Sequence, residues 1–222
     1  MKKMAAGLAF AVLAGTSSAM AFDPAMVAQL LATKNCLGCD LVGADLAGAD
    51  LEGAFIPDVK LAGATLAGAN MLRAYLLFGQ LMGTDLAGAD LTDTNLETVN
   101  MTEAVFINAI LVDASLINST ASRASFDGAN MTGANLSRLN ARGGTFRGAD
   151  MTGANLTNAS LGGADLTGAV LRNATFERSA ITGANFTDAD LTGATVTGTN
   201  LASAILCRTI LPDGAIGNAG CP

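Results

Sequence analysis

Large apolar residues recur at every fifth position of the chain. From Leu41 to Leu206 this spacing never slips, which gives 34 consecutive pentads, and 32 of them carry Leu, Phe, Met, Ile or Val at the central position. An α-helix repeats every 3.6 residues and a β-strand every two, so neither element explains a period of five. A fixed short period over this length predicts a solenoid, in which each repeat packs on its neighbours.

The other positions of the pentad show which surface of the solenoid they occupy. The residue two before the centre is usually Ala, the residue two after it is often Gly, and the residue directly before it is commonly Asp, Asn, Ser or Thr. Positions that demand a large or a small apolar residue face the interior, and positions that accept charges face solvent. Glycine permits a tight corner. Each pentad therefore predicts one short side of a coil, with its centre pointing inward.

The pentads, such as ADLAG at 44–48, resemble the A(D/N)LxG motif of the pentapeptide-repeat family. The resemblance covers residues 41–206, about three quarters of the chain. It implies an all-β solenoid, a right-handed quadrilateral parallel β-helix in which four pentads form one square coil. The 34 pentads, divided by four, would make about 8.5 coils. At a strand spacing of about 4.8 Å, the rod would be roughly 40 Å long.

A square coil places residues 20 apart in one column, which predicts an aromatic ladder in the core. Four phenylalanines are central residues of a single column, with a leucine between the last two. Stacked rings contribute stability beyond their buried area. The four are Phe106, Phe126, Phe146 and Phe186.

The two pentads with an alanine centre also lie 20 apart, at Ala121 and Ala141. The absence of two large side chains in one column predicts a void, and a void in the core lowers the free energy of unfolding. Leu139 occupies a position that otherwise holds small residues, two before Ala141. We expect Leu139 to fill the space that Ala141 leaves.

Residues 1–21 have the features of a secretory signal peptide. Lys2 and Lys3 precede an apolar run, and the small residues of Ala19-Met20-Ala21 form a cleavage site. The run is shorter than the roughly 20 residues that span a bilayer, and no later segment could span one. We therefore expect an exported protein without a membrane span after cleavage, periplasmic or, in a cyanobacterium, thylakoid-lumenal.

Cleavage before Phe22 leaves an acidic protein with little catalytic potential. Two of the 12 Lys and Arg residues are lost, so the net charge is 10 − 19 = −9. This balance argues against binding to nucleic acid, which needs a basic surface. The chain contains no His, the commonest general acid–base residue. We expect no catalytic residues, no metal and no cofactor.

The segment 22–40 predicts a helical cap, because the open end of a β-helix must be covered. Asp23 can cap a helix, and Pro24 suits its first position. A membrane-surface helix is the alternative, but the segment is short and carries one Lys. Four apolar residues share one face and would lie over the first coil: Met26, Val27, Leu30 and Leu31.

Four cysteines flank the repeats, Cys36 and Cys39 before them and Cys207 and Cys221 in the tail 207–222. The two pairs lie roughly 40 Å apart at the strand spacing, whereas disulfide Cα atoms lie within about 7 Å. This excludes cross-pairing and a four-cysteine zinc site.

Two local disulfides, Cys36–Cys39 and Cys207–Cys221, or a redox-active Cys-x-x-Cys remain. An even count in an exported protein favours disulfides. A catalytic Cys-x-x-Cys normally opens a helix, whereas Cys36 and Cys39 follow the predicted one. Both flanks also resemble those of exported members of the family.

Seven of the aspartates that stand directly before a central residue fall on two adjacent sides of the predicted square. They predict an acidic edge along the rod. This edge would be a solubilising surface, a docking site for a basic protein, or a cation-binding site. The seven are Asp45, Asp50, Asp85, Asp90, Asp150, Asp165 and Asp190.

Phe55 and Tyr75 occupy a normally polar, exposed position 20 residues apart, and Phe78 is close by. Pro57 is expected to disturb the same side. An exposed aromatic cluster is a candidate contact site. Alternatively, these rings pack under the capping helix or a local loop.

The sequence thus favours an exported, non-enzymatic scaffold that binds an unidentified protein partner, with homodimerisation by end stacking as a second mode of association. One alternative is a DNA mimic that binds a topoisomerase, as the resemblance implies for some family members. Those members act in the cytoplasm, which the signal peptide argues against. The other alternative is a Cys-x-x-Cys thiol oxidoreductase.

Overall fold

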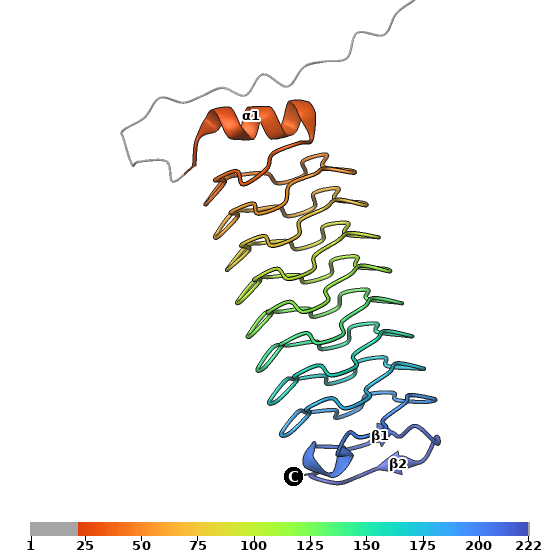
Figure 1. The fold of residues 1–222 in the computed structure, drawn as a ribbon. Coiled ribbons are helices and arrows are strands. Elements are labelled where there is room, and N and C mark those ends of the chain that lie inside the picture. The colour runs from red at the N-terminus through yellow and green to blue at the C-terminus, as the bar shows by residue number, and fades with distance from the viewer. Residues whose placement is uncertain (1–21, 222) are drawn as a thin grey trace, which may run out of the picture.

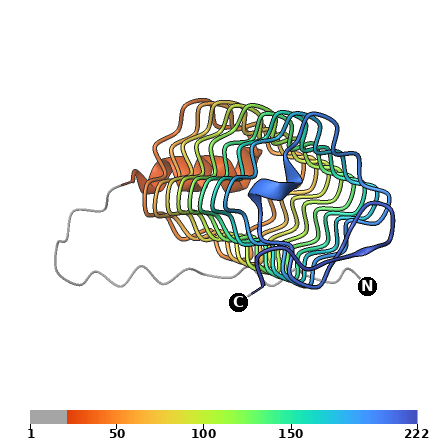
Figure 2. The same cartoon turned by 90° about the horizontal axis from the view of Figure 1, so that it is seen from below.

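The computed structural model describes residues 22–221, so the predicted signal peptide lies outside it. The chain winds into stacked coils that form a rod, with helix α1 (Pro24–Thr33) at one end and a small hairpin at the other (Figure 1). Parallel bridges join residues 20 positions apart, from Asn35 and Phe55 to Asp190 and Ile210. Because every pentad also contains a turn, each coil has four corners, and the coils superpose along the rod (Figure 2).

Backbone hydrogen bonds use four of the five N–H groups of a regular pentad. In the pentad 66–70, Leu66 and Gly68 donate to the next coil, Asn70 donates to the previous coil, and Ala69 closes the turn onto the Leu66 carbonyl. On each side of a coil, only one residue forms a parallel bridge before the chain turns. Each side of a coil is therefore an isolated bridge and not an extended strand. The regular strands that an all-β fold suggests do not form in the coils of the described residues 22–221.

The second residue after each centre except Leu201 adopts a left-handed conformation. Its φ is 64° at Gly48, and similar values recur along the rod. Glycine takes this conformation freely, and Asn or Asp tolerates it, whereas bulky or β-branched residues are strained there. Phe78 at 62° and Thr98 at 57° are such residues, one coil apart in the same column.

Three phenylalanine rings form a stack in the core. The centroids of Phe106 and Phe126 lie 4.7 Å apart and those of Phe126 and Phe146 4.9 Å apart, with interplanar angles of 8° and 7°. Phe186 lies outside this stack, because a leucine separates it from the other three. Its ring instead meets the edge of Phe176, from the opposite side of the coil, at 6.0 Å and 71°.

Near the two alanine centres, the backbone of Gly144 passes close to neighbouring carbonyl groups. Ala121, Ala141 and Leu139 are all fully buried. A Cβ atom placed on Gly144 would lie 3.0 Å from the carbonyl oxygen of Ala124 and 3.2 Å from that of Ala141. Leu139 brings a large buried side chain into the same part of the core.

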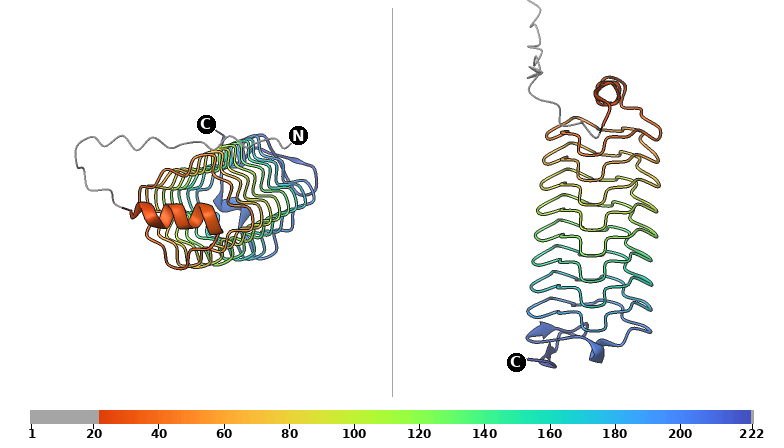
Figure 3. Two further views of the ribbon diagram at one scale, coloured as in Figure 1. Left: turned by 90° about the horizontal axis from the view of Figure 1, so that it is seen from above. Right: turned by 90° about the vertical axis from the view of Figure 1, so that its left-hand side faces the viewer.

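Helix α1 covers the N-terminal end of the rod (Figure 3). It begins at Pro24, and the Asp23 side chain accepts a hydrogen bond of 2.8 Å from the Ala25 amide. The Lys34 ammonium lies 2.9 Å from the Asp50 carboxylate and ties the helix end to the first coil. Within residues 22–221 no helix is long and apolar enough to cross a bilayer.

One residue of the predicted apolar face of α1 points away from the core. Leu30 is fully buried, and Met26 and Val27 pack against the core while half-buried. Leu31 is 43% exposed, so its assignment to the covering face is wrong. Met26, Val27 and Leu30 make the contacts with the core, and Leu31 is rotated by about 100° from Leu30, as consecutive helical residues are.

Both cysteine pairs are disulfides, as the sequence favours. Cys36 and Cys39, with Cα atoms 5.5 Å apart, are buried in the first coil at a central and a small-residue position. Cys207 and Cys221, 4.8 Å apart, hold the C-terminal tail against the last coil. This excludes free thiols at all four positions.

The C-terminal tail replaces the last regular side of the solenoid. A 3₁₀ turn, η1 (Leu201–Ser203), lies across the end of the rod (Figure 2). Strands β1 (Thr209–Ile210) and β2 (Ile216–Gly217) then form an antiparallel hairpin. The five-residue phase continues to Leu206, and the coil geometry is interrupted at η1 and resumes with the parallel bridges at Ile205 and Ile210.

Removing the C-terminal disulfide should cost more stability than removing the N-terminal one. The Cys207–Cys221 bond spans 14 positions and the Cys36–Cys39 bond three. Loop-closure entropy then predicts losses of about 3 kcal/mol for Cys207→Ser/Cys221→Ser and about 2 kcal/mol for Cys36→Ser/Cys39→Ser. Urea denaturation of the oxidised proteins measures both, and the reverse order would contradict the loop-length argument.

Candidate functional site

Each aspartate of the predicted acidic edge stabilises a turn. In all seven, Oδ1 accepts the N–H of the residue two positions later, at 2.9–3.2 Å. This is the one N–H of the pentad that the backbone does not use. Asn residues at the same position, such as Asn70 and Asn95, make the same bond. The Asp or Asn of the motif is therefore first a turn-capping residue.

The acidic edge is also partly neutralised. The four aspartates Asp45, Asp85, Asp90 and Asp150 have no Lys or Arg within 4.0 Å among residues 22–221, and no two of the seven edge aspartates share a column in adjacent coils. In that part of the chain no three His, Cys, Asp or Glu side chains converge as a metal site requires. The other three are paired: Asp50 with Lys34 at 2.9 Å, Asp165 with Arg147 at 2.7 Å and Asp190 with Arg172 at 2.6 Å.

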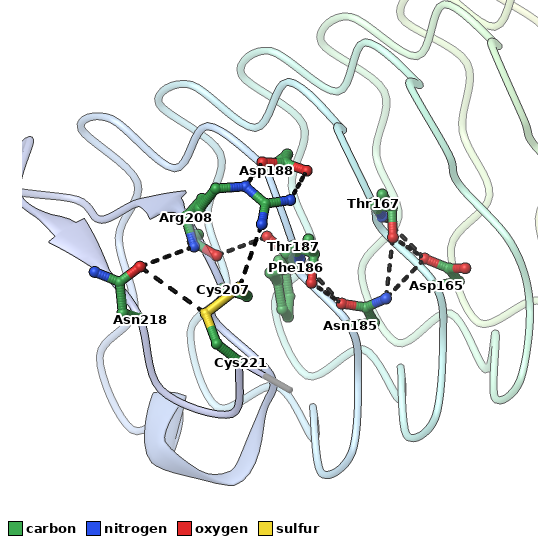
Figure 4. A network of polar contacts seen from close by, with 11 residues as sticks. Asp165, Thr167, Asn185, Phe186, Thr187, Asp188, Cys207, Arg208, Asn218 and Cys221 are labelled. Atoms are coloured by element: carbon green, nitrogen blue, oxygen red, sulfur yellow. Dashed lines mark hydrogen bonds and ion pairs between the residues drawn. A yellow bond between two sulfur atoms is a disulfide. The ribbon is translucent and has the colours of Figure 1, made fainter.

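Hydrogen bonds and ion pairs lower the pKa of several carboxylates. Burial raises the pKa of Asp190, but hydrogen bonds from Thr192 and from the Arg172 guanidinium outweigh it. Near the C-terminus Arg208 donates two bonds of 2.6 Å to Asp188 and lowers the pKa of that carboxylate (Figure 4). The pKa is lowered in four residues: Asp50, Asp165, Asp188 and Asp190.

These pKa shifts predict that the protein loses stability in acid. A carboxylate whose pKa is lower in the folded state stabilises the fold above its unfolded pKa of about 3.9, and this contribution disappears as the pH falls through the folded value. We expect Tm to be nearly constant from about pH 7 to 5 and to fall below about pH 4. Arg208→Gln should weaken the acid-dependent fall, measured by thermal melts. Asp45→Asn is the control, and an equal change in its profile would contradict the assignment to ion-paired carboxylates.

The aromatic residues near the N-terminal end form an exposed cluster. The rings of Phe55 and Tyr75 stack with centroids 5.2 Å apart and an interplanar angle of 12°. Phe55 is 47% and Phe78 48% exposed, and Leu37, in the corner of the coil before Phe55, is 70% exposed. Helix α1 therefore does not cover these rings. We call Leu37, Phe55, Tyr75 and Phe78 the aromatic patch.

Pro57 does not disturb its side, contrary to the sequence-based expectation. The bridges at Phe55 and Lys60 are regular, and the Pro57 carbonyl accepts a bond of 2.9 Å from Gly38. Pro57 follows the centre Ile56, and the N–H of that position is the one the backbone leaves unused. Because proline has no N–H, no Asp or Asn is needed at position 55, and the fold admits Phe55. The coincidence of Pro57 with a missing Asp or Asn is a signal that sequence reasoning could have used.

Coils of 20 residues with apolar centres, small inner residues and capped corners define a solenoid built from five-residue repeats. The family profile described as pentapeptide repeats matches the chain in eight copies, over residues 80–115, 109–148, 149–188 and 184–213. The chain belongs to the pentapeptide repeat family.

Solved structures of other family members resemble this chain. HetL, a pentapeptide repeat protein involved in heterocyst differentiation regulation from the cyanobacterium Nostoc sp. strain PCC 7120, is 28% identical over 82% of this chain and 91% of its own, with a TM-score of 0.62. A trypsin-treated form of QnrB1, a plasmid-mediated fluoroquinolone resistance protein, is 20% identical over 75% of this chain and 91% of its own, with a TM-score of 0.42. A pentapeptide repeat protein from the Arabidopsis thaliana thylakoid lumen is 30% identical over 55% of this chain and 70% of its own, with a TM-score of 0.20. No curated protein matches the chain.

Proposed function

We propose that this protein is an exported, non-enzymatic scaffold that binds a protein partner through the aromatic patch. Phe78 is the observation that carries this proposal. A bulky side chain in the left-handed conformation costs roughly 1–2 kcal/mol, and Phe78 remains half exposed. The left-handed φ alone does not distinguish Phe78, since Thr98 shares it, but within residues 22–221 Phe78 is the one apolar side chain among the non-glycine residues with a positive φ. Backbone strain of this kind concentrates at functional sites.

The neighbours of Phe78 fit the same role. Phe55 and Tyr75 hold each other in place by stacking, so little side-chain freedom would be lost when a partner binds. Aromatic residues are enriched among those that dominate binding energies. HetL, the similar family member named above, is involved in heterocyst differentiation regulation.

The two alternative functions have less support. A thiol oxidoreductase needs an accessible reactive sulfur, whereas Cys36 and Cys39 are bonded to each other and buried. A DNA mimic would need a dense line of charge, since DNA carries one charge per about 1.7 Å. Three of the seven edge aspartates are ion-paired, and none follows another in its column.

For the fold, we adopt the right-handed quadrilateral parallel β-helix of the family. The parallel bridges at 20-residue intervals and the four turns per coil support this choice. Export to the periplasm or thylakoid lumen is supported by residues 1–21 and by two disulfides, which persist in oxidising compartments.

The aromatic patch is tested by crosslinking and pull-down from the native envelope. Phe78→Gly removes the ring and suits the local backbone, and Thr98→Gly makes the same change one coil away. We expect Phe78→Gly to reduce capture of the main partner by about tenfold or more, and Thr98→Gly to leave it unchanged. Both variants should melt at or above the wild-type temperature. Equal capture by all three proteins would contradict the proposal.

A second variant tests the stacked rings, and protein chemistry tests export. Phe55→Ser/Tyr75→Ser should lose the same partner as Phe78→Gly. Mass spectrometry of the envelope protein should give an N-terminus at Phe22. A full-length protein in the cytoplasm would contradict export and favour the DNA-mimic alternative.

A further inference from the structure

One coil carries five branched aliphatic residues at outward positions. The equivalent positions in the next coil are all polar, namely Ser125, Asp127, Asn130, Thr132 and Ser137. In the preceding coil they are Asp85, Ala87, Asp90, Thr92 and Glu97. We call the five residues the aliphatic belt: Val105, Ile107, Ile110, Val112 and Ile117.

The belt is most exposed at one corner of the rod. Ile107 and Ile110 are each 39% exposed, and Val105 is half-buried beside them. Val105 lies in the middle of one side, Ile110 in the middle of the next, and Ile107 at the corner between them. The fold does not require aliphatic residues there, because polar residues occupy the same columns in adjacent coils.

Three carboxylates surround this corner. Parallel bridges place Asp85 next to Val105 and Asp90 next to Ile110, and Asp127 lies 20 residues after Ile107 in the same column. Among residues 22–221 none of the three carboxylates has a Lys or Arg within 4.0 Å.

Each of these carboxylates has one oxygen committed to the fold and one available. The Oδ1 atoms of Asp85, Asp90 and Asp127 accept bonds from backbone amides. Their Oδ2 atoms have no hydrogen-bond donor in the described part of the chain. The corner is therefore an apolar centre with an acidic rim whose carboxylates form no ion pair within the described residues, although Arg147, one coil after Asp127 and paired with Asp165, lies near that carboxylate.

We propose that the corner formed by Val105, Ile107 and Ile110 is a second protein-docking surface, which takes a partner segment with apolar side chains flanked by Lys or Arg. An apolar centre with a charged rim is the usual anatomy of an interface, and rim charges select the partner. The acidic rim opposes nucleic acid, an anionic lipid surface and a second copy of the same corner. This surface does not rest on the aromatic patch, which lies on another side of the coil and nearer the N-terminal end.

The probe for this surface is a synthetic helical peptide with a leucine face flanked by lysines. Its counterpart with glutamates in place of lysines is the charge control. Methyl NMR of the mature, oxidised protein should show shifts at Ile107 and Ile110 with the lysine peptide, and none with the glutamate peptide. No binding of the lysine peptide, or shifts confined to methyl groups elsewhere, would overturn the proposal.

Two variants use residues that the same columns already accept. Ile107→Thr/Ile110→Asn introduces the residue types found at Thr167 and Asn130. Asp85→Asn/Asp90→Asn/Asp127→Asn removes the rim charges, while each Asn can still accept the backbone N–H. Each variant should weaken binding of the lysine peptide by about tenfold at low salt, where exposed charges are least screened.

A third variant removes three negative charges, as many as the rim variant removes, from other parts of the surface. Asp45→Asn/Asp58→Asn/Asp213→Asn should bind the lysine peptide within about twofold of wild type, if the rim and not the net charge attracts it. Equal weakening by this variant, or unchanged binding by Ile107→Thr/Ile110→Asn, would overturn the proposal. So would a homodimer in solution that Ile107→Thr/Ile110→Asn dissociates. Because these variants leave Phe55, Tyr75 and Phe78 intact, failure here leaves the aromatic patch proposal untouched.

Discussion

Replacement of Phe126 by alanine is expected to lower the free energy of unfolding by about 3–5 kcal/mol, the range for large buried aromatic residues. Phe126 is fully buried, and its ring stacks between those of Phe106 and Phe146 at 4.7 and 4.9 Å. Alanine would remove both ring contacts and leave a cavity between two coils. In a solenoid each repeat contacts only its neighbours, so no distant part of the core can compensate. Urea denaturation followed by circular dichroism measures the loss.

Phe126→Leu is the control for this cavity. Leu166 occupies the same column, which shows that the coil accepts leucine at this position. The expected loss is about 1–1.5 kcal/mol, because most of the volume is retained. If Phe126→Leu and Phe126→Ala were equally destabilising, ring stacking rather than the cavity would be the cause.

Leu139→Ala is expected to lower the free energy of unfolding by about 3–5 kcal/mol, at the upper end of the values for buried leucine. Leu139 is fully buried in a column of small residues, two positions before the alanine centre Ala141. Its removal would enlarge the space that Ala121 and Ala141 already leave. Thermal melts should show a greater loss than for Leu136→Ala, a buried central leucine of the same coil, and an equal or smaller loss would contradict the filling role.

A compensating change distinguishes the loss of core volume from a general sensitivity of this coil to mutation. Leu139→Ala/Ala141→Leu moves the large side chain to the central position and restores the usual order of the pentad. We expect the double variant to recover at least half of the loss, because the total core volume is conserved. If the free energy of unfolding did not recover, the close approach of the Gly144 backbone, and not the total side-chain volume, would determine which side chains this coil accepts.

Both proposed docking surfaces lie where outward residues depart from the regular pentad. The regular pentad satisfies the backbone and the core with an Asp or Asn, a central apolar residue and a glycine. Outward positions that depart from this pattern are therefore available for binding. Phe78 departs at the left-handed position and Phe55 at the turn-capping position, where Pro57 removes the need for a cap. Ile110 departs at the turn-capping position within the acidic edge.

The sequence by itself determined the coil, its inward and outward positions, the start of the capping helix and the exclusion of cross-paired cysteines. These features follow from local rules, because every pentad must bury its centre and turn a corner, and the same solution is repeated 34 times. Distance along the rod excluded cross-pairing of the cysteines, and the structure then showed that each local pair is bonded.

Only the tertiary structure decided how side chains from different coils meet. It placed Phe186 against Phe176 rather than in the stack, turned Leu31 to solvent, and paired three edge aspartates with basic residues. The repeat fixes which column a side chain occupies, but its rotamer and its partner depend on neighbours one coil away and across the core. The exposed strain at Phe78 also required the structure, because a positive φ belongs to the backbone and the same position accepts many residue types.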